Sequence, residues 1–143
     1  MSAPRPTVGT SGYSGTPLPR KLGIREGSTV AFLGAPDDFA ATLGPLPDGV
    51  TPRTRLRGPL DVIVFFTVRR AELDRRIAKL KDALDPAGRL WIGWPKRTAK
   101  VETDMTEDVV RDIALPTGLV DNKVCAIDET WSGLQLVIRK ELR

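Results

Sequence analysis

The feature that most constrains the fold of this chain is the unbroken apolar run VIVFF over residues 62–66. A strand with one face in water alternates apolar and polar side chains, so an unbroken run predicts a strand that is buried on both faces. A second run of this kind, VAFL over residues 30–33, comes earlier in the chain. Because strands buried on both faces are typical of parallel sheets that helices cover, these runs predict an α/β fold.

The residues after the first of these runs predict a complete strand–helix–strand unit. A stripe of apolar side chains spaced by four, three and four positions predicts a helix over residues 70–84: Leu73, Ile77, Leu80 and Leu84. Pro86 and Gly88 then end the helix, and the apolar residues after them predict a strand over 89–94. Since the connections are short, we expect the two strands to be parallel, with a right-handed crossover.

Further elements extend this unit in both directions. The chain is expected to contain a strand over 29–33, a short helix from Pro36 to Leu43 with Asp37 and Asp38 in its first turn, an edge strand over 54–57, a helix that comes after a capping box over 104–107 and ends near Leu115, and an antiparallel strand pair over 123–127 and 134–138. Together they predict a three-layer, Rossmann-like α/β domain with a mostly parallel sheet and a C-terminal antiparallel hairpin.

Residues 1–17 differ in composition from the rest of the chain. They consist largely of Pro, Gly, Ser and Thr, which bury too little apolar surface to offset the entropy of ordering. We therefore expect a flexible tail over 1–17, in which Tyr13 can dock on the domain, and a single α/β domain over 18–143. No apolar run approaches the roughly 20 residues that cross a bilayer, so we expect a cytoplasmic protein without membrane contact.

Composition excludes several kinds of chemistry. The chain has no histidine and one cysteine, Cys125, which rules out an internal disulfide, Ser-His-Asp and Cys-His mechanisms, and the usual metal sites. Cys125 falls in an apolar strand, where it is expected to be a small, buried apolar residue. We therefore predict no metal ion and no catalytic residue, and the balance of the sequence is against an enzyme.

The net charge is small. The 143 residues include 22 basic and 18 acidic side chains, a formal net charge of +4, without a dense basic run. The basic residues of the helix over 70–84 are interrupted by Glu72, Asp74 and Asp82, as on an ordinary solvated helix face. These features predict weak attraction to anions and do not predict a dedicated nucleic-acid surface.

Part of the chain resembles the class I S-adenosylmethionine-dependent methyltransferases. Residues 61–64 resemble the fourth strand of that family, residues 84–90 resemble the turn before its fifth strand, and the hairpin over 123–138 resembles its sixth and seventh strands. The resemblance covers roughly residues 28–140 and implies a methyltransferase-like fold. These features mark the fold and do not themselves bind the cofactor.

The cofactor-binding half departs from the family pattern. The family has a glycine-rich turn after its first strand, whereas residues 34–38 here contain one glycine, Gly34, followed by Pro36 and two aspartates. About 17 residues separate Leu43 from Leu60, too few for the family's second strand, its helix and the third strand. The acidic residue with which the family holds the cofactor's ribose has no equivalent. We therefore expect a fold that lacks part of its first half, and no cofactor.

Other segments look like an uncharacterised bacterial family, a domain of unknown function. The similar segments are residues 13–18 (YSGTPL), 94–96 (WPK) and 128–134 (DETWSGL), which together span nearly the whole chain. This resemblance implies no established activity.

Candidate site residues can be chosen from the expected sheet. In open α/β sheets, ligands bind beyond the carboxyl ends of the parallel strands. That rule collects ten residues: Gly34, Asp37, Thr67, Arg69, Trp94, Lys96, Arg97, Asp128, Glu129 and Trp131. Two tryptophans together with cations and carboxylates can form a pocket for a planar, partly anionic molecule. The alternative is that Trp94 and Trp131 pack together as a lid, with Lys96 and Glu129 as solvated neighbours.

The sequence as a whole predicts a non-catalytic binding or regulatory module. Its expected partner is a protein or a small anionic ligand, which would meet the rim around Trp94, Lys96 and Trp131. Two alternatives stay open. One is a minimal S-adenosylmethionine-dependent methyltransferase, and the other is a weak nucleic-acid binder that uses the tail and the long helix, whose binding would fall steeply with salt.

Overall fold

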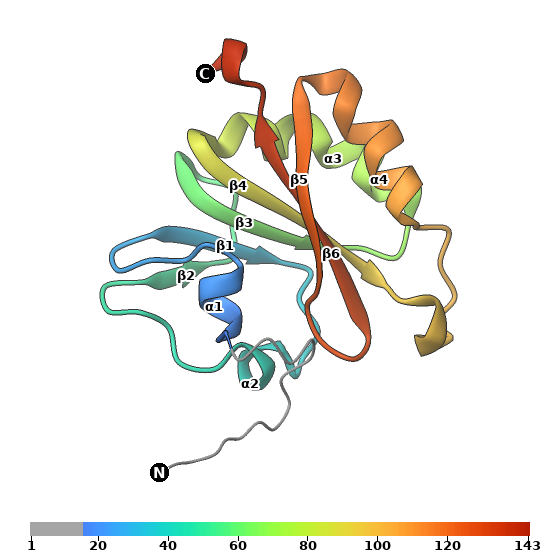
Figure 1. Cartoon of the computed structure of the whole chain (residues 1–143), viewed down its shortest axis with the longest axis horizontal. Coiled ribbons are helices and arrows are strands. Elements are labelled where there is room, and N and C mark those ends of the chain that lie inside the picture. Colours follow the sequence, from blue (N-terminus) through green and yellow to red (C-terminus); the bar gives the residue numbers. More distant parts are fainter. Residues whose placement is uncertain (1–15) are drawn as a thin grey trace.

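A computed structural model describes residues 16–143 of the chain (Figure 1). In chain order, the elements of this range are α1 (Leu18–Lys21), β1 (Thr29–Leu33), α2 (Phe39–Leu43), β2 (Thr51–Arg53), β3 (Leu60–Phe66), α3 (Arg70–Ala83), β4 (Leu84–Pro95), η1 (Arg97–Ala99), α4 (Glu107–Ala114), η2 (Leu115–Thr117), β5 (Leu119–Ala126), β6 (Trp131–Ile138) and η3 (Lys140–Leu142). The tail predicted over 1–17, with Tyr13, lies almost entirely outside the described residues. Within them, no helix combines the length and the apolar character needed to cross a membrane.

The described strands form one sheet in the order β2-β1-β3-β4-β6-β5. The pairs β2–β1, β1–β3 and β3–β4 are parallel, whereas β6 is antiparallel to both β4 and β5. The prediction of a mostly parallel sheet with a C-terminal antiparallel hairpin is therefore confirmed. In β3, every side chain from Val62 to Phe66 is buried, as the unbroken apolar run requires.

Helices cover both faces of the sheet, which gives three layers (Figure 1). One core cluster packs α3 and α4 against strand residues such as Ile63 and Leu90. The second cluster packs α1 and α2 against the intervening residues, such as Val64 and Trp91. This division arises because successive side chains of a strand point to opposite faces of a sheet. Each unbroken apolar run therefore supplies both cores at once.

The helix after β1 begins later than the sequence predicts. Residues Pro36 to Phe39 first form a turn, in which the Phe39 N–H donates to the Pro36 carbonyl at 3.0 Å, and α2 starts only at Phe39. Asp37 and Asp38 therefore precede the helix instead of lying in its first turn. The prediction of a helix from Pro36 is wrong at its start and right at its end, Leu43.

The edge strand also lies earlier than predicted. Thr51–Arg53 pairs with Thr29–Ala31 of β1, whereas residues 54–57 lie beyond the end of β2. The loop after β2 is held against α3, because Leu56 packs on the core cluster of that face. Gly58 approaches α3 so closely that a Cβ there would lie 2.3 Å from the carbonyl oxygen of Ala83. These contacts explain why the strand ends at Arg53.

The start of α4 is capped, although not by the residue that the sequence pattern indicated. Thr106 is the N-cap, and its Oγ1 accepts a hydrogen bond from the Val109 N–H at 3.1 Å. Asp104, the first residue of the predicted capping box, instead accepts from the Arg70 N–H at 2.7 Å. Asp104 thereby caps the start of α3 from the loop that leads to α4.

Candidate functional site: the carboxyl rim of the sheet

The carboxyl ends of β1, β3 and β4 lie along one edge of the sheet, which we call the carboxyl rim. Because β1 has β2 on one side and β3 on the other, the topological switch point lies between β1 and β3. Gly34 comes directly after β1 with a φ of +67°, and a Cβ built there would lie 2.7 Å from the carbonyl oxygen of Phe66 at the end of β3. The turn after β1 therefore rests directly on β3.

Four aromatic side chains line the α1/α2 side of the switch point, and we call them the aromatic row: Phe32, Phe39, Phe66 and Trp131. Successive rings pack edge to face, with centroids 5.2, 4.9 and 5.2 Å apart. Phe39 and Phe66 are each 3% exposed. The row runs from the end of β1 through α2 to the start of β6. The protein's own side chains thus fill this part of the rim.

The structure separates the two tryptophans on which the expected pocket depended. Trp94 is paired with Ser132 in the sheet, and Trp131 is paired with Pro95. Trp94 is 6% exposed and belongs to the core cluster of α3 and α4, whereas Trp131 packs with the cluster on the opposite face. Trp94 and Trp131 therefore form neither a shared pocket nor a shared lid, because adjacent register positions place them on different faces of the sheet.

Thr67 ties the end of β3 to the start of α3. Its N–H donates to the Gly93 carbonyl at 3.0 Å, and its hydroxyl accepts from the Arg69 N–H at 3.1 Å and lies in hydrogen-bond contact with the Glu72 carboxylate. Thr67 is 3% exposed, so its N–H and its hydroxyl are hydrogen-bonded to partners inside the protein. The Asp104 carboxylate already caps the start of α3, which removes that helix end as an anion site.

The β5–β6 loop brings Lys96 to the rim. The Lys96 N–H donates to the Thr130 carbonyl at 2.7 Å, which joins the end of β4 to this loop. Asp128 shapes the loop, because its Oδ1 accepts from the Thr130 and Trp131 N–H groups at 2.8 Å each. The rim therefore gathers Lys96, Thr130 and Trp131, while the Asp128 carboxylate serves the fold of the loop.

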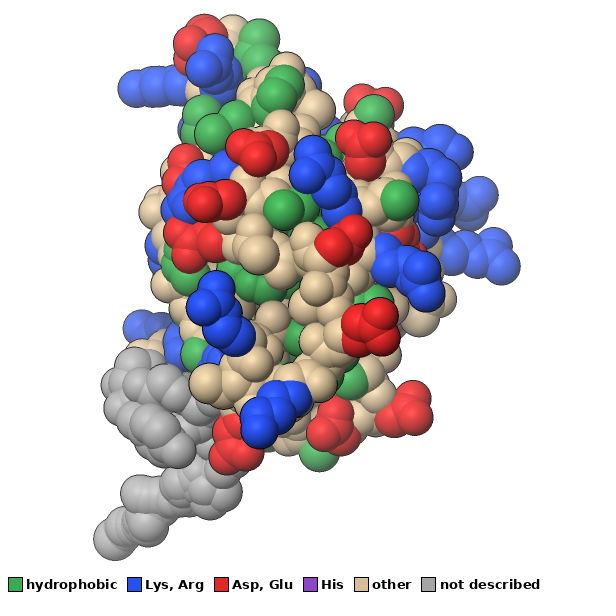
Figure 2. Space-filling model, turned by 90° about the vertical axis from the view of Figure 1, so that its right-hand side faces the viewer, with side chains coloured by type: hydrophobic (Ala, Val, Ile, Leu, Met, Phe, Trp, Pro, Cys, Tyr) green, Lys and Arg blue, Asp and Glu red, His purple; other side chains and the backbone are tan. Residues whose placement is uncertain are grey.

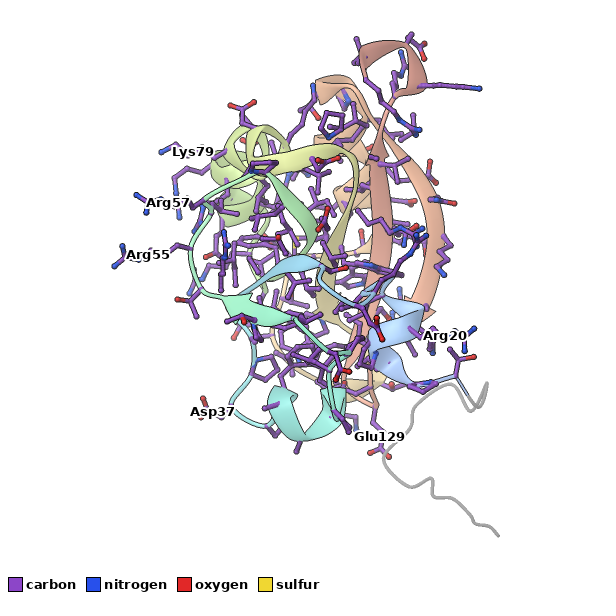
Figure 3. All side chains as sticks on the ribbon, turned by 90° about the vertical axis from the view of Figure 1, so that its left-hand side faces the viewer. Arg20, Asp37, Arg55, Arg57, Lys79 and Glu129 are labelled. Carbon is purple, nitrogen blue, oxygen red and sulfur yellow. The ribbon has the colours of Figure 1, made fainter. Side chains whose placement is uncertain are left out.

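The remaining charged residues of the rim are exposed and lie apart. Arg69, Arg97, Asp37 and Glu129 are all exposed, and Figure 3 shows Asp37 and Glu129 on opposite sides of α2, pointing away from each other. Across residues 16–143, every ion pair within 4 Å involves Arg111, so none of these rim charges is paired. On the face in Figure 2, basic and acidic side chains are interspersed across the middle.

Cavities occur at both ends of the sheet. At the rim, a cavity of about 370 Å³ lies beside the start of α3 between Arg69 and Glu102. At the amino ends of the strands, an open groove of about 790 Å³ lies between α1 and the loop around Leu46, with Arg25 and Arg89 in its lining. Asp61 lies at that same end and accepts from the Thr29 N–H at 2.8 Å, which gives it a structural role.

The basic residues of α3 lie on two sides of the helix. On the flank toward α4, Lys81 Nζ donates to the Thr117 carbonyl at 2.5 Å. On the other flank, Lys79 projects into solvent on the same side as Arg55 and Arg57 of the loop after β2 (Figure 3). None of these three has a carboxylate partner in the part of the chain that the structure describes. Together these three residues form a small basic surface (Figure 3).

Gln135 is a polar residue of interest that no sequence motif singled out. It lies in the middle of β6 and is 1% exposed, and its Nε2 has no hydrogen-bond partner among residues 16–143. A signal was present, because Gln135 interrupts the apolar run of residues 134–138. No cluster of three or more His, Cys, Asp or Glu side chains suited to a metal ion occurs in residues 16–143.

Comparison with known proteins identifies the fold. No protein-family model matches the sequence, and no curated protein does. A SAM dependent methyltransferase from Aquifex aeolicus superposes with a TM-score of 0.55 and 17% identity, over 83% of this chain and 86% of that one. DhpI in complex with SAH gives 0.58 and 13% identity over 87% and 83%. Aeropyrum pernix fibrillarin with natively bound S-adenosyl-L-methionine gives 0.55 and 14% over 89% and 71%.

These similarities establish a methyltransferase-like, Rossmann-type fold for the chain, as its sequence predicted. At 13% to 17% identity they establish the fold alone, because one fold hosts many functions. The resemblance to an uncharacterised bacterial family stays a prediction.

Proposed function

We propose that this chain is a non-catalytic binding module of the cytoplasm, built on a methyltransferase-like fold. Its binding surface is the carboxyl rim on the side of Trp131 and Lys96, and its partner is a protein or a small anionic ligand. The single observation that carries this proposal is the closed switch point, where Gly34 rests on the Phe66 carbonyl and the aromatic row fills the adjoining space.

The residues at the switch point do not fit the cofactor of the methyltransferase family. A bound nucleoside needs open space where the turn after β1 meets the end of β3. There a Cβ on Gly34 would already lie 2.7 Å from the Phe66 carbonyl oxygen, and the aromatic row fills the adjoining space. The strand beside β1, β2, ends in Arg53, where the family pattern calls for an acidic residue that holds the ribose. A guanidinium offers hydrogen-bond donors only and cannot accept from ribose hydroxyls.

The first experiment measures thermal unfolding of the full chain with and without millimolar S-adenosylhomocysteine. A ligand at 100 times its dissociation constant adds about 2.7 kcal/mol of stability, which moves the midpoint of a domain this size by several degrees. We expect no shift. A saturable shift of several degrees would overturn the proposal and support the alternative of a minimal methyltransferase.

The second experiment tests the rim itself by affinity capture from cell extract. We expect the partner captured by the wild-type protein to be lost with Trp131→Ala and with Lys96→Glu. Lys96→Glu reverses a half-exposed charge without opening the core, so it separates loss of binding from loss of folding. Leu142→Ala is the matched control, since Leu142 is an exposed apolar side chain, 55% exposed, at the other end of the molecule. If neither rim variant reduced capture, the rim would not be the binding surface.

A further inference from the structure

A row of three residues crosses the sheet on the face that α1 covers. Gln135 of β6 is paired with Trp91 of β4 on one side and with Lys123 of β5 on the other. Residues directly opposite each other on neighbouring strands share a face of the sheet. The face is that of α1, because the Trp91 indole N–H donates to the Leu22 carbonyl at 3.0 Å.

The middle residue of this row has an unused hydrogen-bond donor. Gln135 is 1% exposed, and its Nε2 has no hydrogen-bond partner in the described part of the chain. Buried polar atoms in proteins are nearly always hydrogen-bonded, so an amide N–H₂ in this position points to an acceptor that binds from outside the protein. Tryptophan and lysine, the neighbours on either side, are both donors and cannot supply that acceptor.

Two lysines lie near this row. Lys123 Nζ lies 5.9 Å from the centroid of the Trp91 ring, so the side chain reaches over the row toward β4. Lys21 ends α1 and immediately precedes Leu22, which holds the Trp91 indole. Neither lysine forms an ion pair within the described range of the chain. The row and the two lysines near it therefore carry an unpaired amide donor and two ammonium groups that have no carboxylate partner in residues 16–143.

Cys125 lies on the same surface of the sheet as this row. It lies two positions after Lys123 in β5, on the same face of the sheet, and it is half-buried. Burial raises the pKa of the Cys125 thiol, while the positive charges of Lys21 and Lys123 lower it. Both lysines thus lie near enough to Cys125 for their charges to act on its thiol. Because the thiol is neutral near pH 7, it offers no negative charge to satisfy the two ammonium groups.

We propose that Lys21, Lys123 and Gln135 form a binding site for a small oxyanion, the carboxylate or phosphate group of a small molecule. One anionic oxygen accepts from Gln135 Nε2, and the two ammonium groups neutralise its charge. The site is separate from the carboxyl rim, because Trp91 lies four residues before the end of β4, a distance of about 13 Å along the strand. Its existence does not depend on the function proposed for the rim.

The sequence provides an unusually direct test, since Gln135 is the sole glutamine of the chain and Asn122 is the sole asparagine. The spectrum of the ¹⁵N-labelled protein therefore contains two side-chain amide pairs. Sodium acetate and inorganic phosphate are titrated separately, with sodium chloride at matched ionic strength as the reference. We expect the Gln135 pair to shift saturably with acetate, phosphate or both, and the exposed Asn122 pair to stay in place. The anion that binds more tightly identifies the group recognised.

Variants locate the site. Loss of one cation from a partly exposed site corresponds to a roughly threefold to fivefold weaker affinity, which we expect for Lys123→Ala and for Lys21→Ala. Lys79→Ala is the matched control, because Lys79 is an exposed lysine of α3 on the other side of the sheet, and it should leave the affinity unchanged. Gln135→Leu should fold and should abolish binding, since it replaces the unpaired amide by an apolar group of similar size.

Labelling of Cys125 gives an independent readout that needs no variant, because it is the only cysteine. Its reaction with uncharged N-ethylmaleimide should slow over the same anion concentrations that shift the Gln135 resonances. The proposal is overturned if sodium chloride shifts the Gln135 pair as far as acetate and phosphate do, or if neither anion shifts it. It is also overturned if Lys79→Ala weakens binding as much as Lys123→Ala.

Discussion

At the residue scale, Gly34 is subject to two separate constraints that can be tested separately. Its φ of +67° lies in the left-handed region, and a Cβ there would lie 2.7 Å from the Phe66 carbonyl oxygen. Gly27 has a similar φ of +73°, but a Cβ there would meet no atom of residues 16–143 within 4 Å. The two glycines are therefore matched in φ and differ in the space around them.

We predict that Gly34→Ala destabilises the fold more than Gly27→Ala does. The left-handed conformation costs alanine about 1 to 2 kcal/mol at either position. At Gly34 the steric overlap adds about 1 to 3 kcal/mol, because backbone atoms must shift to make room. Urea unfolding of both variants measures the difference. Equal losses of unfolding free energy would mean that the turn after β1 is not closed on β3.

At the residue scale, the positions of some site residues could be predicted from the sequence and those of others could not. The carboxyl-end rule correctly placed Gly34, Thr67 and Lys96 at the rim, because it depends only on strand direction. It could not place Trp94 and Trp131 on opposite faces, since the face of each side chain depends on its register within the strand, and a shift of one residue reverses it.

At the element scale, one arginine links α4 to β5 by polar contacts in addition to the apolar core that the two elements share. Arg111 Nε donates to the Asp121 carboxylate at 3.0 Å, and its Nη1 lies 2.5 Å from a Glu107 carboxylate oxygen. The hydrogen bond from Arg111 lowers the pKa of the Asp121 carboxyl, and partial desolvation opposes that shift. The hydrogen bonds from Arg111 to both carboxylates in turn raise the pKa of its guanidinium.

The sign of the resulting pH dependence is fixed by linkage. A carboxyl whose pKa is lowered by folding stabilises the protein above its unfolded pKa, about 3.9 for aspartate, and this contribution disappears as the pH falls through the lower folded value. We predict that Asp121→Asn is less stable than wild type near neutral pH and equally stable in strong acid. The effect is small, because the pair is partly exposed to solvent.

Chemical unfolding at several pH values measures this difference. Asp108→Asn is the control, because the Asp108 side chain is 93% exposed and lies 3.9 Å from Arg111, so its removal should change little at any pH. If the stability deficit of Asp121→Asn did not shrink toward acid pH, then Arg111 would not stabilise the Asp121 carboxylate in the folded protein.

Element boundaries show where the sequence was insufficient. α3 was predicted over 70–84 and spans Arg70–Ala83, because its apolar stripe and its terminating Pro and Gly are local signals. The edge strand was misplaced because its end is decided by contacts of Leu56 and Gly58 with α3, which lie far from it in sequence. Gln135 escaped attention for a related reason, since a single polar residue in a strand gives no sign of whether it has a partner.

At the scale of the whole molecule, the fold could be predicted because sequence signals for its main elements occur all along the chain. Unbroken runs identify β1 and β3, one amphipathic helix links β3 to β4, and the short connection before β6 makes the final pair antiparallel. What remains to be tested is where the domain begins, which the sequence predicts at residue 18. α1 is the element on which that question depends.

Two shortened chains decide where the domain begins. A chain that starts at Thr16 should unfold within about 3 °C of the full-length protein, because it keeps α1 and every described residue of both core clusters. A chain that starts at Arg25 loses Leu22 and Ile24, which are 0% and 4% exposed, and leaves the Trp91 indole N–H without its acceptor. Removing each of those side chains costs about 2 to 5 kcal/mol, a sum comparable with the entire stability of a domain. Calorimetry should therefore show no cooperative transition for the chain that starts at Arg25. A normal unfolding transition of that chain would instead mean that the domain begins after α1.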